Sequence, residues 1–390
     1  MTRRTLAAVV AFAAAAPASA AASHEPELVG RAILPADATA PAPFPGAPNT
    51  EPAPAPGARQ PVGGFSALLD APGRDTFYAM PDNGFGTKAN SRSFLLRVYR
   101  VRADFETRRG GDGDVAVRDW ITLSDPRRKV PFPIVTEGSR DRLLTGGDFD
   151  PESLRIARDG TLWFGDEFGP FLLHTDARGR VLEAPIALPD GVRSPDAPPP
   201  YALPPRIGSS NGFEGMAISP NRKTLYPALE GPVAGDDPTT RRVYEFDIRK
   251  RRWSSTVRQY RVADPTHLLS DLTALDKRRF VALERDNFEG PAARHKRAFV
   301  YDLRTAAKRE VLDQLDIADP ALISLPARPG DFGLGDPFKM PYITIESVLP
   351  LGGGRLAIVN DTNFGSRGRN PALPDYSDFI VVDVLGVPSR

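Results

Sequence analysis

The stretch GGDFDPESLRIARDGTLWFGDEFGPFLLHTDARGRVLEAPIAL occupies residues 146–188 and predicts four short β-strands joined by tight turns. The predicted strands cover residues 152–157, 161–165, 171–175 and 180–186. Each run is rich in Leu, Ile, Val or aromatic residues, and Asp-Gly or Arg-Gly separates the runs, as in antiparallel hairpins. Acidic residues open the first strand (Glu152) and close the second (Asp166, Glu167). Antiparallel pairing would bring these carboxylates to one end of the sheet.

The same pattern recurs in four further units, which predicts an all-β propeller of five four-stranded blades. The equivalent first-strand positions are predicted to be Ser66, Glu152, Glu214, Asp271 and Glu346. The other predicted strands cover residues 63–68, 76–84, 94–101, 115–123, 212–218, 224–231, 242–248, 253–262, 269–275, 279–287, 298–303, 345–349, 355–363 and 378–384. The 41 prolines and 34 glycines favour turns over helices. A sixth blade within the long connections stays an alternative.

The two ends of the chain are predicted to close the ring. Residues 28–34 form a spare strand, while the last unit lacks a fourth strand, so pairing the two would remove an exposed edge. Residues 35–61 contain nine prolines and cannot build a core. We therefore interpret them as a surface insertion inside a single domain spanning residues 23–390.

Residues 1–22 have the pattern of a secretory signal peptide. A basic start with Arg3 and Arg4 precedes an apolar run and small residues suited to cleavage. Export to the periplasm or the extracellular space is expected, with the Sec route favoured and the twin-arginine route open. Further segments are too short or too polar for a stable membrane anchor.

Composition and missing motifs exclude several functions. The net charge is +1 and basic blocks with interleaved aromatics are absent, which argues against nucleic acid as a partner. The chain lacks cysteine and a P-loop. Its one G-x-S-x-G match, residues 208–212, lies before a predicted strand, whereas a nucleophile elbow joins a strand to a helix, so such an elbow is not supported. His174, His267 and His295 are scattered, and each is interpreted as a structural or surface residue, so zinc is poorly supported. A monomer acting on a small molecule is expected.

Acidic residues gather where the first strands begin and the second strands end. In a propeller the first strand of each blade lines the central channel, so these side chains should meet at one mouth. Such carboxylates need protons or cations to coexist, and an oxygen-only ligand set suits Ca²⁺, with Mg²⁺ as the second choice. The predicted metal-ligating residues are Glu152, Asp166, Glu214, Glu230, Asp271, Asp286, Glu346, Asn360 and Asp361.

A structural explanation competes with the metal site. Asp and Asn are ordinary turn formers, and turns alone explain Asp82-Asn83-Gly84 and Asp159-Gly160. Glu is a poor turn former, and Glu at the start of an inner strand is costly unless it is paired or metal-bound. A Glu–Arg network around Arg285 is therefore the main alternative.

Several segments resemble the phytase-like family named for esterase-like activity, which comprises exported bacterial β-propeller proteins. The resemblance extends over about residues 62–384. The segments that carry it are Val62–Ser66, Asp82–Gly84, Glu152–Leu154, Trp163–Pro170, Asn211–Met216, Glu230–Pro232, Glu284–Asn287 and Asn360–Asn363. It implies hydrolysis of an ester or phosphoester. The D-A-x-D-D-P-A motif of β-propeller phytases is absent from the sequence.

Together these patterns give the hypothesis of an exported, metal-dependent hydrolase acting on an ester or phosphoester at a channel mouth. Glu167 and Glu284 are the predicted bases, and Arg285 would stabilise the developing negative charge. A lactonase-like propeller, with Asn360 and Asp361 as ligands, is an alternative enzyme. A non-enzymatic periplasmic or extracellular binding module with a structural calcium is the other alternative.

Overall fold

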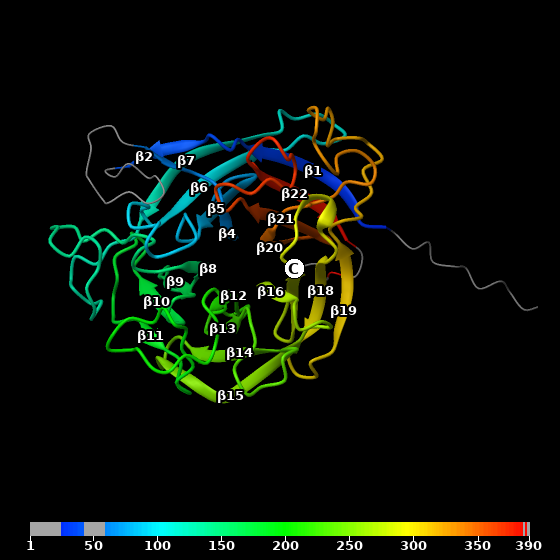
Figure 1. The fold of residues 1–390 in the computed structure, drawn as a ribbon. Coiled ribbons are helices and arrows are strands. Elements are labelled where there is room, and N and C mark those ends of the chain that lie inside the picture. Colours follow the sequence, from blue (N-terminus) through cyan, green and yellow to red (C-terminus); the bar gives the residue numbers. More distant parts are fainter. Residues whose placement is uncertain (1–24, 43–58, 385–386, 388–390) are drawn as a thin grey trace, which may run out of the picture.

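The computed structural model describes residues 25–42, 59–384 and 387. Its regular structure is nearly all β-strand (Figure 1). The predicted signal peptide lies outside the described residues. Within the described part of the chain, helical structure is limited to the 3₁₀ turn η1 (Gly290–Ala292), and no helix is long and apolar enough to cross a membrane.

The described strands form five sets of four, and each set is an antiparallel meander. The first two sets are β4 (Phe65–Asp70), β5 (Thr76–Pro81), β6 (Arg97–Asp104), β7 (Asp114–Thr122), and β8 (Pro151–Ile156), β9 (Leu162–Asp166), β10 (Phe171–Thr175), β11 (Ile186–Ala187). The next two are β12 (Phe213–Ile218), β13 (Thr224–Leu229), β14 (Thr240–Asp247), β15 (Arg252–Arg261), and β16 (Leu268–Ala274), β17 (Arg279–Arg285), β18 (Lys296–Asp302), β19 (Lys308–Asp313). The last is β20 (Thr344–Gly352), β21 (Arg355–Asp361), β22 (Ser377–Asp383) and β1 (Glu27–Leu34).

The first strands of the sets contact one another in a closed cycle, β4 to β8, β12, β16, β20 and back to β4. The sets therefore lie around one central axis (Figure 1). Apolar side chains fill the spaces between neighbouring sets: Met80 of the first set shares a buried cluster with Leu154 and Phe164 of the second. The predicted β-propeller is confirmed.

The ends of the chain close the ring as predicted. β1 pairs antiparallel with β22, and Ala32 lies opposite Phe379. A single parallel bridge between Ile33 and Asp114 joins β1 to β7, so two sets form one continuous eight-stranded sheet. Beyond β1, the described ends of the proline-rich segment form β2 (Thr39–Pro41) and β3 (Arg59–Pro61), which pair with each other.

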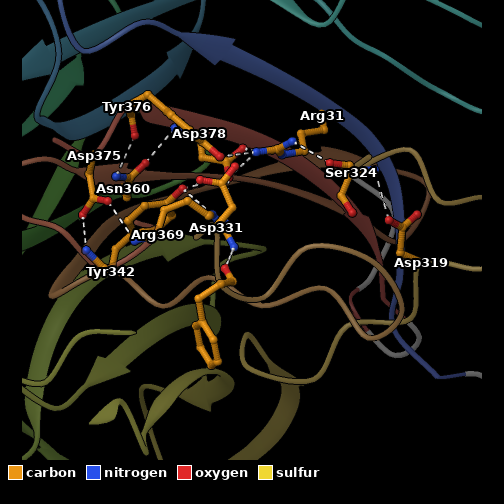
Figure 2. Close-up of polar contacts among 12 residues, drawn as sticks. Arg31, Asp319, Ser324, Asp331, Tyr342, Asn360, Arg369, Asp375, Tyr376 and Asp378 are labelled. Atoms are coloured by element: carbon orange, nitrogen blue, oxygen red, sulfur yellow. Dashed lines mark hydrogen bonds and ion pairs between the residues drawn. The ribbon is translucent and has the colours of Figure 1, made fainter. Parts of the chain in front are cut away.

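A buried network of charges fastens this closure (Figure 2). Asp378 of β22 accepts hydrogen bonds from Arg31 Nε of β1 at 2.9 Å and from Arg369 Nη2 at 3.0 Å. The hydroxyl of Tyr342 donates to the same carboxylate, and Arg31 also donates to the Tyr376 hydroxyl. Burial alone would raise the pKa of Asp378, but the two guanidiniums hold it below its usual value. The anion is thus stabilised although it is fully buried.

The outer strands are where the sequence-based boundaries are least accurate. Residues 180–186 are predicted to form the fourth strand of the second set, but β11 contains only two residues. Pro185 cannot donate a ladder hydrogen bond, which explains the late start. The outer strand β19 is absent from the prediction because KREVLD has little apolar alternation, and two of its six residues are exposed.

Replacing Asp378 should strongly destabilise the ring. In Asp378→Ala, Arg31 and Arg369 would stay buried without their counter-charge, which typically costs about 3–5 kcal/mol. Urea unfolding should show this loss in the free energy of unfolding. The control is Glu310→Gln, which removes a surface ion pair with Arg297 and should change stability by less than about 1 kcal/mol. An equally small effect of both substitutions would contradict the proposed fastening role.

Candidate functional site

Three inner-strand glutamates converge at one mouth of the channel, as the sequence predicts. Glu152 of β8, Glu214 of β12 and Glu346 of β20 each offer a carboxylate oxygen, and these oxygens lie within 4.8 Å of one another. The residues are 4–6% exposed. Three strands that are far apart in sequence therefore place three buried carboxylates around one point.

A β-bulge near the start of every first strand explains this convergence. The ladder of each first strand is irregular at the equivalent place. The residues inside the irregularities are Ser66, Glu152, Glu214 with Gly215, Ser270 and Glu346. A bulge leaves a residue outside the regular pairing and redirects its side chain, and bulges often lie beside functional sites. Here the bulges direct three glutamates towards the axis.

Four further carboxylates extend this group. Glu152 also lies within 4.8 Å of Asp82 and Asp150, and Glu214 lies equally close to Glu167 and Glu230. Because the groups share Glu152 and Glu214, they form one continuous set. We call these seven residues the acidic cluster: Asp82, Asp150, Glu152, Glu167, Glu214, Glu230 and Glu346.

Arg285 is paired with one side of the acidic cluster. Its Nη2 atom lies 2.7 Å from Glu230 Oε1, 3.5 Å from Glu346 Oε1 and 4.0 Å from Glu214 Oε1. Burial opposes the charge of Arg285, but these carboxylates outweigh it and raise the pKa of the guanidinium. Among the described residues, none forms a hydrogen bond with the buried Glu214 Oε1. One guanidinium therefore leaves an oxygen of the cluster unsatisfied.

Burial and mutual repulsion raise the pKa of the carboxyl groups in the cluster. The pKa of Glu346 rises to about 8, chiefly through burial and then through repulsion from Asp361. Burial likewise raises the pKa of Asp150 to about 6, although hydrogen bonds from Glu152 and Asn83 oppose the shift. Glu152 and Glu214 have pKa values well above the ordinary value, first through burial and then through repulsion, chiefly from Glu214 on Glu152 and from Glu230 on Glu214. The cluster must hold protons or bind cations near neutral pH.

Asp166 and Asp361 lie beside the acidic cluster and shape its wall. Asp166 accepts hydrogen bonds from the backbone N–H groups of Asp150 at 2.9 Å and Gly169 at 2.7 Å. Asp361 contributes to the raised pKa values of cluster members and approaches the backbone at Gly64. A Cβ at Gly64 would lie 2.5 Å from Asp361 Oδ1, and its φ of +63° also favours glycine. The close approach thus depends on this glycine.

The prediction that Asp271 lines the mouth is wrong by one residue. The bulge of β16 contains Ser270, so Ser270 is the equivalent of Glu152 and Glu214, and Asp271 faces the other way. The carboxylate of Asp271 accepts the backbone N–H groups of Leu272 at 2.7 Å and Val348 at 2.9 Å. Asp271 therefore joins neighbouring sets instead of serving as a ligand.

Asp286 and Asn360 are also placed outside the acidic cluster. Asp286 accepts three backbone N–H groups and lies 2.8 Å from Lys296 Nζ. Asn360 Oδ1 accepts the backbone N–H of Asp378 at 2.7 Å, and its amide donates to Tyr376. The polar atoms of both residues are used in holding the loops and strands of the site.

Glu284 does not meet the other glutamates, contrary to the prediction. Successive residues of a strand point to opposite faces, so Arg285 faces the acidic cluster and Glu284 faces away. Glu284 instead contacts Tyr260, His295 and Lys308. Burial opposes its charge, but these three partners hold the pKa of Glu284 below its usual value.

Three members of the cluster are missing from the predicted ligand set: Glu167 is predicted as a base instead, and Asp82 and Asp150 are not among the predicted site residues. The sequence assigns Asp82 to a turn, and Asp82 does accept the Gly84 N–H at 2.7 Å while also facing Asp150. Asp150 lies in the segment before the predicted strand, where Asn83 donates to both of its oxygens. The spacing of Asp150 and Glu152 is a usable signal, because alternate residues of a strand share a face.

The fold and this site define the class of protein: a β-propeller with a buried carboxylate cluster at one mouth of its channel. Residues 60–364 match the family described as "Phytase-like: Esterase-like activity of phytase". The chain belongs to this family, as its motifs predict.

Other known proteins are similar over shorter stretches or at lower identity. An "Uncharacterized secreted protein" of Arthroderma benhamiae is 34% identical over 123 residues, which is 25% of this chain and 24% of that protein. Exo-β-1,3-galactanase of Phanerochaete chrysosporium aligns over 87% of this chain and 63% of its own, with 10% identity and a TM-score of 0.44. Hydrazine synthase of Kuenenia stuttgartiensis aligns over 77% of each chain, with 14% identity and a TM-score of 0.36. The chain thus matches about a quarter of the secreted relative and under two thirds of the galactanase.

Without divalent cations, the protein should lose stability as pH rises from about 5 to 8. Folded Asp150 and Glu346 have pKa values of about 6 and about 8, whereas unfolded carboxyls titrate near 4, so the folded state holds more protons in this window. Raising the pH therefore favours the unfolded state. Thermal unfolding in chelator across this range is the measurement. Glu346→Gln should flatten the slope, and a midpoint that rises with pH would contradict the assignment.

Proposed function

We propose that the acidic cluster binds divalent cations, with Ca²⁺ as the preferred ion. The observation that carries this proposal is the buried Glu214 Oε1, which has no hydrogen-bond partner among the described residues. Charged carboxylates buried at such density are costly without compensation. Ca²⁺ accepts six to eight oxygen ligands in flexible geometry, which suits a shared set of carboxylates. Mg²⁺ would need a stricter octahedron with water ligands.

We further propose that the protein is a hydrolase of an ester or phosphoester. The family description supports this class, and a bound divalent cation would supply the polarisation of the substrate oxygen. Arg285 lies against Glu346 and Glu230, where its guanidinium would stabilise negative charge that develops on the substrate. Glu167, whose pKa burial raises, would exchange a proton at its carboxylate.

The structure changes the weight of the alternatives. The lactonase-like reading relied on Asn360 as a ligand, and the amide of Asn360 is engaged by backbone groups instead. One observation favours the binding module with a structural calcium. Arg285 is already paired with Glu230 at 2.7 Å, so its guanidinium is less available to a substrate anion. This alternative predicts cation binding without turnover.

We also propose that the protein is exported. The basic and apolar pattern of residues 1–22 supports this, and the similar protein of Arthroderma benhamiae is described as secreted. The same export would place the acidic cluster in a compartment where calcium is abundant enough to fill weak sites, which extracellular modules bind at about 10⁻⁴–10⁻³ M. Cell fractionation with an antibody to the mature chain tests this.

Calcium should stabilise the purified protein through Glu214. A cation present at 100 times its dissociation constant stabilises the folded state by about 2.7 kcal/mol, and the thermal midpoint should rise accordingly. Glu214→Gln should reduce this rise, while the matched surface variant Glu310→Gln should keep it. If elemental analysis detects no bound metal and calcium leaves the thermal midpoint unchanged, cation binding is contradicted.

Turnover should require both the cation and Arg285. The mature protein should hydrolyse a member of a panel of phosphomonoesters, carboxyl esters and lactones with Ca²⁺, and chelator should abolish the activity. Arg285→Gln should lower kcat by about 10²–10³, the usual effect of losing a donor to a developing anion. A calcium-dependent midpoint without turnover on the panel would instead establish the binding module.

A further inference from the structure

A second group of ionisable side chains lies at the same end of the fourth set of strands. His267 ends the connection before β16, Glu284 is near the end of β17, and His295 immediately precedes β18. Their ligand atoms lie within 4.8 Å of one another. The two imidazole rings are stacked with centroids 3.7 Å apart. Residues that are scattered in sequence are thus brought together by the start and end of three adjacent strands.

The carboxylate of Glu284 is held in one orientation. Its Oε1 atom accepts hydrogen bonds from the Tyr260 hydroxyl and from Lys308 Nζ. The other oxygen, Oε2, faces His295 Nε2 at 3.3 Å. Hydrogen bonds of this kind orient metal ligands in many proteins. Tyr260 and Lys308 therefore turn the free oxygen of Glu284 towards the histidines.

His267 supplies a nitrogen that the protein itself does not use. Among the described residues, none forms a hydrogen bond with its buried Nδ1 atom. Its backbone N–H donates to the Asp264 carbonyl, and its own carbonyl accepts from the fully buried Arg241, so the backbone of His267 is held in place. Burial and the neighbouring His295 lower the pKa of His267, which keeps the imidazole neutral with an available lone pair. A buried polar atom without a partner is costly unless a ligand satisfies it.

We propose that His267, His295 and Glu284 bind one transition-metal dication of the Zn²⁺ class. Two imidazole nitrogens and one carboxylate oxygen form a donor set that Zn²⁺ accepts, and a fourth position is left for water or a ligand. The acidic cluster offers only oxygens and suits a hard cation. The protein thus has two candidate sites of different chemistry, and the second does not depend on the proposed hydrolase function.

Binding requires one imidazole to turn. A metal approaches an imidazole nitrogen in the plane of the ring, whereas the two rings are nearly parallel, with 14° between their planes. His267 is the ring that turns, because it is the more exposed of the two. His295, which is 9% exposed, stays directed at Glu284.

Cobalt is a spectroscopic probe for this site. The full-length mature chain, without a histidine tag, is titrated with Co²⁺ in excess Ca²⁺, which occupies the acidic cluster. We expect one Co²⁺ per chain with visible absorption bands, and Zn²⁺ should displace it. His267→Ala and His295→Gln should each weaken binding by at least tenfold. Tyr260→Phe should weaken it by about 10–100-fold, since it removes only the orienting hydrogen bond.

Controls separate this site from the acidic cluster. Glu214→Gln should retain the cobalt spectrum, while calcium should raise its thermal midpoint less than that of the unmodified protein. The experiment therefore tests the two sites independently. Thermal unfolding without metal verifies that the histidine variants are folded, and His267→Ala should be the milder because His267 is only half-buried. Absence of cobalt bands, or binding that survives both histidine substitutions, would overturn the proposal. Loss of cobalt binding in Glu214→Gln would assign the ion to the acidic cluster instead.

Discussion

The pairing of Asp378 with Arg31 and Arg369 is the interaction on which the ring depends. It connects the first strand of the described chain to the last, and therefore determines whether the sheets close or present free edges. Two buried cations share one anion, and the hydroxyl of Tyr342 completes its coordination. Such an arrangement tolerates little displacement, because a charge left without its partner in the interior is expensive. The closure consequently fixes the positions of all the first strands around the axis.

That rigidity is what permits the acidic cluster to exist. Seven carboxyl groups repel one another and resist burial, and a flexible scaffold would separate them. The backbone instead holds them through bulges and through hydrogen bonds such as those from Asn83 to Asp150. Electrostatic strain at the mouth is thus opposed by packing between the sheets. A cation would relieve that strain without any rearrangement of the ring.

Most of the architecture could be predicted from the sequence, because each unit repeats short apolar runs and Asp-Gly or Asn-Gly turns. The convergence of Glu152, Glu214 and Glu346 followed from the same repeat. Asp271 was misassigned because a bulge shifts the register by one residue, and apolar alternation does not reveal where a bulge falls. Glu284 was misassigned because the sequence does not show which of two successive residues, Glu284 or Arg285, faces the axis from β17. His267 and His295 could not be paired in advance, since their contact depends on the loop before β16 and the turn before β18.

The five bulges are equivalent in backbone but not in side chain. Glu346 lies between two serine positions in the ring, with Ser66 donating to it at 3.0 Å, while Glu152 and Glu214 occupy adjacent sets. Although the five sets repeat one backbone arrangement, the two sides of the mouth therefore carry different side chains. A ligand entering it would meet two adjacent glutamates on one side, and on the other side one glutamate flanked by two serine positions. The backbone of the propeller is nearly symmetric around its axis, but the side chains at the five bulges are not. An asymmetric ligand would therefore have one preferred orientation in the site.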